Sequence, residues 1–245
     1  MNDRGVWAIW YDVENDDRQP FFQWLHETYL PFLSANKQFA WVAHYERHRG
    51  ALTASWRLDH EAYERHTTAE LKSGTQFVQL VGAATPYVFI NAIQEHDEGA
   101  GPAGAGEMLK LRKGVRHEVF IEVERAYGPL GPKGLDGSLA ACIQFGNYRM
   151  ASVEKDLACM SWYPDVCFPA LAQAKDSLRT RKLISVAGWS KHGVIYEFPS
   201  VEGRNQAFAH VQKLRAADPS KIFSLGPQTV HAPGSAFIGT RTWPA

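Results

Sequence analysis

A twelve-residue segment, FQWLHETYLPFL at positions 22–33, recurs in altered form as MSWYPDVCFPAL at positions 160–171. Alignment of the two segments matches three pairs of identical residues: Trp24 with Trp162, Pro31 with Pro169, and Leu33 with Leu171. The members of each pair are 138 positions apart (162 − 24, 169 − 31, 171 − 33). Trp and Pro are uncommon residues, and both segments lie between apolar runs typical of strands. The sequence therefore predicts two copies of one structural unit, with the two tryptophans as core anchors.

Length and charge restrict the class of protein. A chain of 245 residues forms one large domain or two of ordinary size, and the repeat favours two. Lys plus Arg (26) equal Asp plus Glu (26), so no overall field attracts nucleic acid or an anionic membrane. No apolar run is long enough to cross a bilayer, and the N-terminus lacks a secretory signal. We therefore expect a cytoplasmic protein with no nucleic-acid partner and no membrane partner.

Residues 1–95 are expected to form the first unit. Strand-type composition occurs at 6–13, 39–46, 51–58 and 87–93, and helical spacing with capping residues at about 20–33 and 59–71. Pro31 lies inside the first helical pattern and is expected to end or kink that helix. The order β, α, β, β, α, β is that of the ferredoxin-like split βαβ arrangement.

Residues 96–138 are expected to be a Gly-rich linker followed by an accessory strand. The segment EHDEGAGPAGAGE at 95–107 has the composition of a flexible linker or an exposed loop. The alternating run HEVFIEVER at 117–125 predicts a strand, which we place at an edge of either unit.

Residues 139–245 then repeat the order of the first unit, with strands near 140–145, 183–189, 194–198 and 236–242 and helices capped by Ser152 and Ser200.

The first unit combines an opening strand, a Trp-anchored helix ending in a Leu-Pro step, and a second strand that closes on Ala43-His44-Tyr45-Glu46. This combination resembles the dimeric α/β-barrel superfamily, especially EthD-like proteins. The resemblance implies an α+β fold in which two ferredoxin-like βαββαβ units of one chain pair their sheets as a pseudo-dimeric α/β barrel. EthD-like sequences often carry a His two places before this Pro, where this chain has Tyr29 and Cys167. Members of the superfamily include monooxygenases, isomerases, polyketide cyclases and haem enzymes, so the fold alone does not define the chemistry.

Strand alternation suggests which side chains line a ligand site. In the strand 51–58, Ser55 and Arg57 share one face, and they point into the barrel if the opposite apolar face packs on the helices. His44 is the candidate acid or base, with Arg57 as its charged partner. Three aromatic residues are the expected walls of the site: Tyr29, Trp41 and Tyr45. Such a pocket suits a planar anionic or phenolic molecule.

The leading hypothesis is binding of a small, partly aromatic organic molecule in a barrel cavity. Whether the molecule is also converted is left open, and such a conversion would need no metal and no organic cofactor. The histidines form no HExxH motif, which favours no metal site. A second hypothesis is a non-catalytic interaction or structural protein. The third is a haem enzyme with a ligand among His192, His210 and His231. Assembly into a homo-oligomer is left open.

Overall fold

The computed structural model describes residues 3–49, 71, 74–97, 101–131, 139–217 and 229–244. The elements of the first unit are β1 (Gly5–Val13), η1 (Asn15–Asp17), α1 (Arg18–Trp24), η2 (Leu25–Tyr29), α2 (Leu30–Ser34), β2 (Phe39–Arg47), β3 (Phe77–Ala83), η4 (Pro86–Val88), α3 (Phe89–Asp97), α4 (Ala105–Met108), η5 (Leu109–Leu111) and β4 (Arg112–Tyr127). Those of the second unit are β5 (Cys142–Met150), α5 (Val153–Trp162), η6 (Tyr163–Cys167), α6 (Phe168–Ala172), β6 (Arg179–Ala187), β7 (His192–Phe198), α7 (Val201–Ala217), β8 (Thr229–His231) and β9 (Phe237–Trp243).

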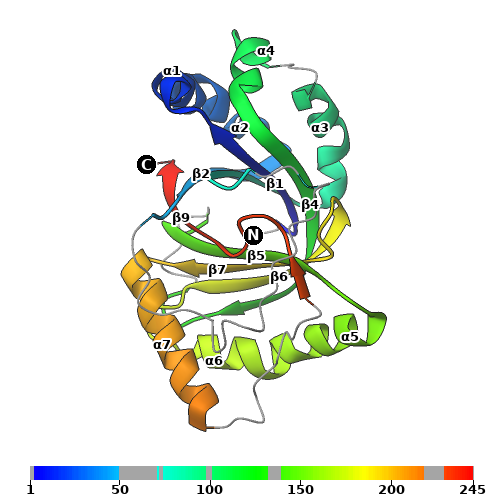
Figure 1. The fold of residues 1–245 in the computed structure, drawn as a ribbon, viewed down its shortest axis with the longest axis vertical. Coiled ribbons are helices and arrows are strands. Elements are labelled where there is room, and N and C mark those ends of the chain that lie inside the picture. Colours follow the sequence, from blue (N-terminus) through cyan, green and yellow to red (C-terminus); the bar gives the residue numbers. More distant parts are fainter. Residues whose placement is uncertain are drawn as a thin grey trace.

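Two ferredoxin-like sheets close on each other to form one antiparallel barrel (Figure 1). The first sheet has the strand order β4-β1-β3-β2 and the second β6-β7-β5-β9. β4 pairs with β6, and β2 pairs with β9, so both junctions join one unit to the other. β8 adds to β5 outside this ring. The helices of each unit cover the outer face of their own sheet, on opposite sides of the barrel (Figure 1). The fold is thus α+β, with two ferredoxin-like units paired as a pseudo-dimeric barrel.

The repeated Trp/Pro segment forms the same helix in both units. A π-helical turn interrupts each helix, at Leu25–Tyr29 and at Tyr163–Cys167, and a short α-helix follows. The two turns are again 138 positions apart (163 − 25, 167 − 29). Pro31 and Pro169 fall in the first turn of the helices that follow. Pro31 therefore does not end the helix. The wider π turn before it accommodates a residue that has no backbone N–H donor.

The expected strand at 87–93 is wrong, because this segment forms η4 and the start of α3. Phe89, Ala92, Ile93 and His96 have helical spacing, and the first three pack on the core of the first unit. The fourth strand of this unit is instead β4. The Gly-rich segment that precedes it ends in the short helix α4. β4 lies between β1 and β6 and is not at an edge. The expected strand at 51–58 and nearly all of the helix at 59–71 lie outside the described residues. The boundaries 1–95, 96–138 and 139–245 stay a prediction.

Three apolar cores follow from strand alternation. On β1, Val6, Ala8 and Trp10 point into the barrel, whereas Trp7 and Tyr11 face the helices. The barrel core contains aromatic and aliphatic side chains from both units, and a separate core lies between each sheet and its helices. At about 25 cal/mol per Å² of buried apolar surface, this packing is the main source of stability.

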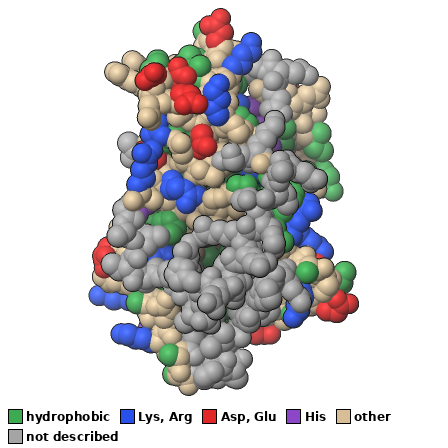
Figure 2. All heavy atoms as spheres, in the orientation of Figure 1, with side chains coloured by type: hydrophobic (Ala, Val, Ile, Leu, Met, Phe, Trp, Pro, Cys, Tyr) green, Lys and Arg blue, Asp and Glu red, His purple; other side chains and the backbone are tan. Residues whose placement is uncertain are grey.

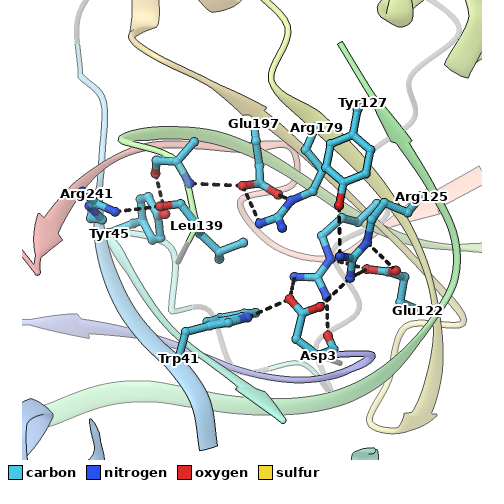
Figure 3. A network of polar contacts seen from close by, with 12 residues as sticks. Asp3, Trp41, Tyr45, Glu122, Arg125, Tyr127, Leu139, Arg179, Glu197 and Arg241 are labelled. Atoms are coloured by element: carbon cyan, nitrogen blue, oxygen red, sulfur yellow. Dashed lines mark hydrogen bonds and ion pairs between the residues drawn. The ribbon is translucent and has the colours of Figure 1, made fainter. Parts of the chain in front are cut away.

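A buried charged network connects the N-terminal segment to both units at one end of the barrel (Figure 3). Arg181 of β6, which is fully buried, contacts the carboxylates of Asp3 and Glu122. Arg125 donates to Asp3 at 2.6 Å and to Glu122 at 2.7 and 2.8 Å. Burial raises the pKa of Asp3, but the charge of Arg181 and hydrogen bonds from Arg125 and Trp41 outweigh it and hold this pKa below its usual value.

Figure 2 shows both acidic and basic side chains among the described residues of the face in view. In the described part of the chain, no helix has the length and apolar character needed to span a membrane.

Replacement of Arg181 by Met should destabilise the fold strongly, because it leaves the Asp3 and Glu122 carboxylates in a buried site with less positive charge. We expect a loss of about 3 kcal/mol in the free energy of unfolding, measured by urea denaturation. Arg4→Met is the matched control, since Arg4 is exposed, and should change this quantity by less than about 0.5 kcal/mol. Equal effects of the two substitutions would show that the network does not stabilise the barrel.

Candidate functional site

The structure places the sequence-predicted site residues on different faces of the sheet. His44 is fully buried on the helix side of β2. Trp41 and Tyr45 point into the barrel, where Trp41 donates to Asp3 at 2.9 Å and Tyr45 to the carbonyl of Ala140 at 2.6 Å. The remaining aromatic residue, Tyr29, hydrogen-bonds His96 under the helices. Ser55 and Arg57 lie outside the described residues. The described candidates therefore do not line one common pocket.

His44 is the centre of a hydrogen-bonded chain with a defined direction. Its Nε2 is 2.7 Å from the Tyr11 hydroxyl, and its Nδ1 is 2.5 Å from the Thr242 hydroxyl of β9. The Thr242 hydroxyl donates to the carbonyl of His44 at 3.3 Å, so it accepts from Nδ1–H. Nε2 then accepts from Tyr11. The chain is a neutral imidazole between two hydroxyl groups.

Burial controls the charge of this first cluster. It lowers the pKa of His44 to about 3, with His26 contributing further, so His44 is neutral near pH 7. The same burial holds the pKa of Tyr11 far above its usual value. The ring of His26 lies 5.5 Å from that of His44, and its Nε2 is buried with no hydrogen-bond partner among the described residues. His26 is half-buried and connects His44 to the surface of α1 and η2.

A second polar cluster lies at the corresponding place in the second unit, and sequence reasoning missed it. Lys182 of β6 is 1% exposed, and its Nζ lies 3.3 Å from the Tyr148 hydroxyl and 4.6 Å from the centre of the Tyr163 ring. The Tyr148 hydroxyl also contacts the Tyr163 hydroxyl at 2.9 Å and the Cys159 thiol at 3.2 Å. Among the described residues, no carboxylate contacts Lys182. Burial therefore lowers the pKa of Lys182 to about 8.

His192 connects Lys182 to the surface. Its Nε2 is 2.7 Å from Asp156 Oδ1, and its Nδ1 is 3.2 Å from Lys182 Nζ. Because an ionised carboxylate only accepts, Nε2 carries the proton and Nδ1 accepts from Lys182. Asp156 also pairs with the exposed Lys191. Burial and the Lys182 charge lower the pKa of His192 to about 4. The result is a chain of proton-exchanging groups from Asp156 to a buried amine.

The two clusters occupy equivalent positions in the two sheets. Phe77 of β3 pairs with Tyr11 and with Glu46, two residues after His44. In the same way, His192 of β7 pairs with Tyr148 and with Ile184, two residues after Lys182. The offset of 138 that relates Trp24 to Trp162 also relates His44 to Lys182 (182 − 44). This offset, applied to His44, is the sequence signal that would have identified Lys182.

Solved structures with the same fold cover nearly the whole chain. A candidate chlorite dismutase matches with a TM-score of 0.57 and 11% identity, over 99% of this chain and 96% of that one. The dye-decolorizing protein from V. cholerae matches with a TM-score of 0.55 and 11% identity (98% and 94%). A variant of the chlorite dismutase from Candidatus Nitrospira defluvii matches with a TM-score of 0.52 and 12% identity (99% and 92%). No family model and no curated protein sequence matches. The chain thus has the fold of the dimeric α/β-barrel superfamily.

The surroundings of His192, one of the three candidate haem ligands, do not fit a haem. A haem between sheet and helices needs a free axial ligand and a slot for the macrocycle, yet both ring nitrogens of His192 are engaged. Sheet and helix side chains also touch directly, as in the Tyr148–Tyr163 contact and the Tyr196–Phe208 ring pair at 5.6 Å. Among the described residues, no three His, Cys, Asp or Glu side chains lie together in a group that could hold a metal ion.

Replacement of Lys182 by Met should stabilise the protein in a pH-dependent manner. The pKa of Lys182 falls from 10.5 to about 8 on folding, so between these values the unfolded chain binds a proton that the folded protein has lost. The charged amine therefore costs roughly 3 kcal/mol at most below pH 8, and this cost disappears as the pH rises towards 10.5. We expect Lys182→Met to raise the free energy of unfolding at pH 7, with a gain that shrinks between pH 8 and pH 10.

Urea denaturation at several pH values measures this difference. Lys175→Met, at an exposed lysine, is the matched control and should change stability by less than about 0.5 kcal/mol at every pH. A gain that does not vary with pH would mean that Lys182 titrates normally.

Proposed function

We propose that this protein binds a small, partly aromatic organic molecule and converts it by proton transfer, without a metal or an organic cofactor. The observation that carries the proposal is the buried Lys182 amine, held by Tyr148 and His192 with no carboxylate in contact among the described residues. A buried amine with a pKa of about 8 is partly deprotonated near neutral pH and can act as a general base. The fold, shared with a candidate chlorite dismutase and a dye-decolorizing protein, is compatible with this activity but does not demonstrate it.

The groups around Lys182 suit a substrate with an acidic C–H bond next to a carbonyl group. Lys182 takes the proton, and the electron pair moves to the carbonyl oxygen. The Tyr148 or Tyr163 hydroxyl then donates to this oxygen, which lowers the energy of the enolate. Return of the proton to a different carbon gives an isomer, and return to the same carbon gives exchange with solvent. His192 and Asp156 connect Lys182 to solvent protons.

The aromatic surroundings favour an aromatic substrate. The rings of Tyr148, Tyr163 and His192 lie around the amine, with Tyr148 stacked on His192 at 5.4 Å. Substrate entry requires movement of α5 and η6, which supply Cys159 and Tyr163. The π-helical geometry of η6 suits such a movement, because π turns have weaker hydrogen bonds and are frequent at functional sites.

In the first unit, His44 is proposed as the equivalent acid–base group. The chain Thr242–His44–Tyr11 has the polarity needed to accept the Tyr11 proton at Nε2. The low pKa of His44 makes it a weaker base than Lys182. We infer that the two units are repeats of one ancestral unit whose polar positions have diverged, with Lys182 as the main catalyst and His44 as its counterpart. We also propose that the protein is cytoplasmic, as expected from its sequence.

The test is solvent exchange of carbon-bound protons in D2O, followed by NMR with phenylpyruvate, acetophenone and 2-indanone as probes. We expect exchange of at least one probe above the buffer rate, with a rate that rises with pH through about 8 as Lys182 loses its proton. Lys182→Met and Lys182→Arg should each lower the rate at least a hundredfold, since neither side chain is a base at this pH. Lys175→Met should retain the rate within twofold.

Two results would contradict the proposal. One is the absence of catalysed exchange with all three probes. The other is exchange that persists in Lys182→Arg, because a permanently charged guanidinium cannot take the proton.

A further inference from the structure

The barrel has charged residues at two levels of its interior, and the two groups differ in how well they are paired. Glu118 and Glu122 both point inwards from β4, as does Arg116. Around Glu122, both carboxylate oxygens accept hydrogen bonds from arginines. Arg181 Nη1 has no hydrogen-bond partner among the described residues, but it lies 3.4 Å from Asp3 Oδ2 in an ion pair. Around Arg116 and Glu118, three buried polar atoms have no hydrogen-bond partner among the described residues: Arg116 Nε, Arg116 Nη2 and Glu118 Oε2. The pair Arg116/Glu118 is therefore incompletely satisfied, although it lies in the same barrel.

The free atoms of Arg116 form one edge of its guanidinium group. Nη1 pairs with Glu118 Oε1, which leaves Nε and Nη2 side by side. This edge presents two parallel N–H donors, the arrangement that binds a carboxylate in a bidentate manner. One face of the guanidinium group lies over the Trp10 ring, with Cζ 4.3 Å from the ring centre. The side chain is 5% exposed, so its direction is fixed by packing.

Glu118 presents the complementary group. Its Oε1 already accepts from Arg116, from Ser190 at 2.9 Å and from Asn147 at 3.4 Å. Its Oε2 is buried and accepts no hydrogen bond from the described residues. Gly188 packs against this side chain: it has φ +121°, and a Cβ there would come within 2.8 Å of Glu118 Cγ. The carboxylate therefore has a fixed position and one free acceptor.

Charge balance selects the chemical class of the ligand. Leaving a buried donor or acceptor unsatisfied costs about 1 to 3 kcal/mol, and more for a charged group. An anion alone would satisfy Arg116 but would leave a net negative charge in a buried site, and a cation alone would do the reverse. A molecule with one carboxylate and one ammonium group satisfies both residues and adds no net charge.

We propose that Arg116 and Glu118 form a binding site inside the barrel for a small amino-acid-like zwitterion, whose carboxylate binds Arg116 Nε and Nη2 and whose ammonium group binds Glu118 Oε2. Burial lowers the pKa of Arg116 and raises that of Glu118, and their mutual attraction opposes both shifts. A bound zwitterion adds a second partner of opposite charge to each group. The site is separate from the proposed catalytic cluster, because Lys182 faces the helices and Arg116 faces the barrel.

Isothermal titration calorimetry with a homologous series tests this site on the full chain. The probes are glycine, β-alanine and γ-aminobutyrate, which differ in the distance between the two charges, with acetate and methylammonium as half-ligands. We expect at least one zwitterion to bind tenfold more tightly than either half-ligand. NMR of the arginine Nε–H groups gives a direct readout, since the resonance that is missing in Arg116→Lys should shift when that zwitterion binds.

Two variants separate the roles of the residues. Arg116→Lys keeps the charge but loses the two-donor edge, and it should weaken zwitterion binding at least tenfold. Glu118→Gln should reduce zwitterion affinity to the level of acetate and leave acetate binding unweakened. Arg4→Lys, at an exposed arginine, is the matched control and should bind like the wild type.

The proposal is overturned if no member of the series binds, if acetate binds as tightly as every zwitterion, or if the Arg116 Nε–H resonance does not shift. Unchanged affinity in Arg116→Lys would also overturn it. None of these results depends on proton exchange at Lys182, so this test and that of the proposed function fail separately.

Discussion

Closure of the barrel by β4–β6 and β2–β9 pairing is the constraint on which the rest of the structure depends. A single ferredoxin-like sheet has two open edges, whose unpaired backbone groups invite association with other chains. Pairing the two sheets of one chain satisfies these edges and places one face of every strand in a shared interior. That interior must then be filled by side chains, and the barrel core shows how: apolar residues fill its middle, and buried ion pairs such as Arg181–Glu122 lie towards one end. The outer faces receive helices, which creates two similar sheet–helix layers on opposite sides of the barrel.

The two sheet–helix layers show how equal scaffolds acquire unequal chemistry. In both, a tyrosine of the first strand and a polar residue of the second strand meet across the third strand. Phe77 lies between them in one unit, and His192 in the other. Phe77 cannot exchange protons, so His44 reaches only hydroxyl groups and the nearby His26 ring. His192 can exchange protons, and it hydrogen-bonds both Lys182 and Asp156. One aromatic position therefore distinguishes a neutral histidine held between two hydroxyl groups from an amine that is hydrogen-bonded through His192 to Asp156.

Much of this fold was predictable from local patterns, whereas the site was not. The Trp/Pro segment identified a helix that occurs in both units, because Pro31 and Pro169 each remove a backbone N–H donor at the corresponding position. Ser152 and Ser200 correctly marked helix starts, since each side chain accepts a backbone hydrogen bond there. The segment 87–93 misled because β-branched and aromatic residues also suit a helix that packs on a core. Strand alternation assigns side chains to the two faces of a strand, but it could not say which face meets the helices, because that choice depends on long-range packing. No local pattern marks Lys182, whose sequence signal is the offset of 138 from His44.

Packing alone does not explain how the buried charged groups of this protein are paired. Folding tolerates buried charges when they are paired, as around Arg181, where removing one partner costs more than the pair contributes. Lys182 and the Arg116/Glu118 pair depart from this rule in different ways. Within the described part of the chain, Lys182 lacks a counter-charge in contact but has proton-accepting neighbours, which is the environment that makes an amine reactive. Arg116 and Glu118 have each other but retain fixed hydrogen-bonding atoms without a partner among the same residues, which is the environment that recognises a ligand. A scaffold whose stability comes from barrel closure and three apolar cores can tolerate both, and their positions on opposite faces of the sheet keep the proposed catalytic cluster and the proposed binding site physically separate.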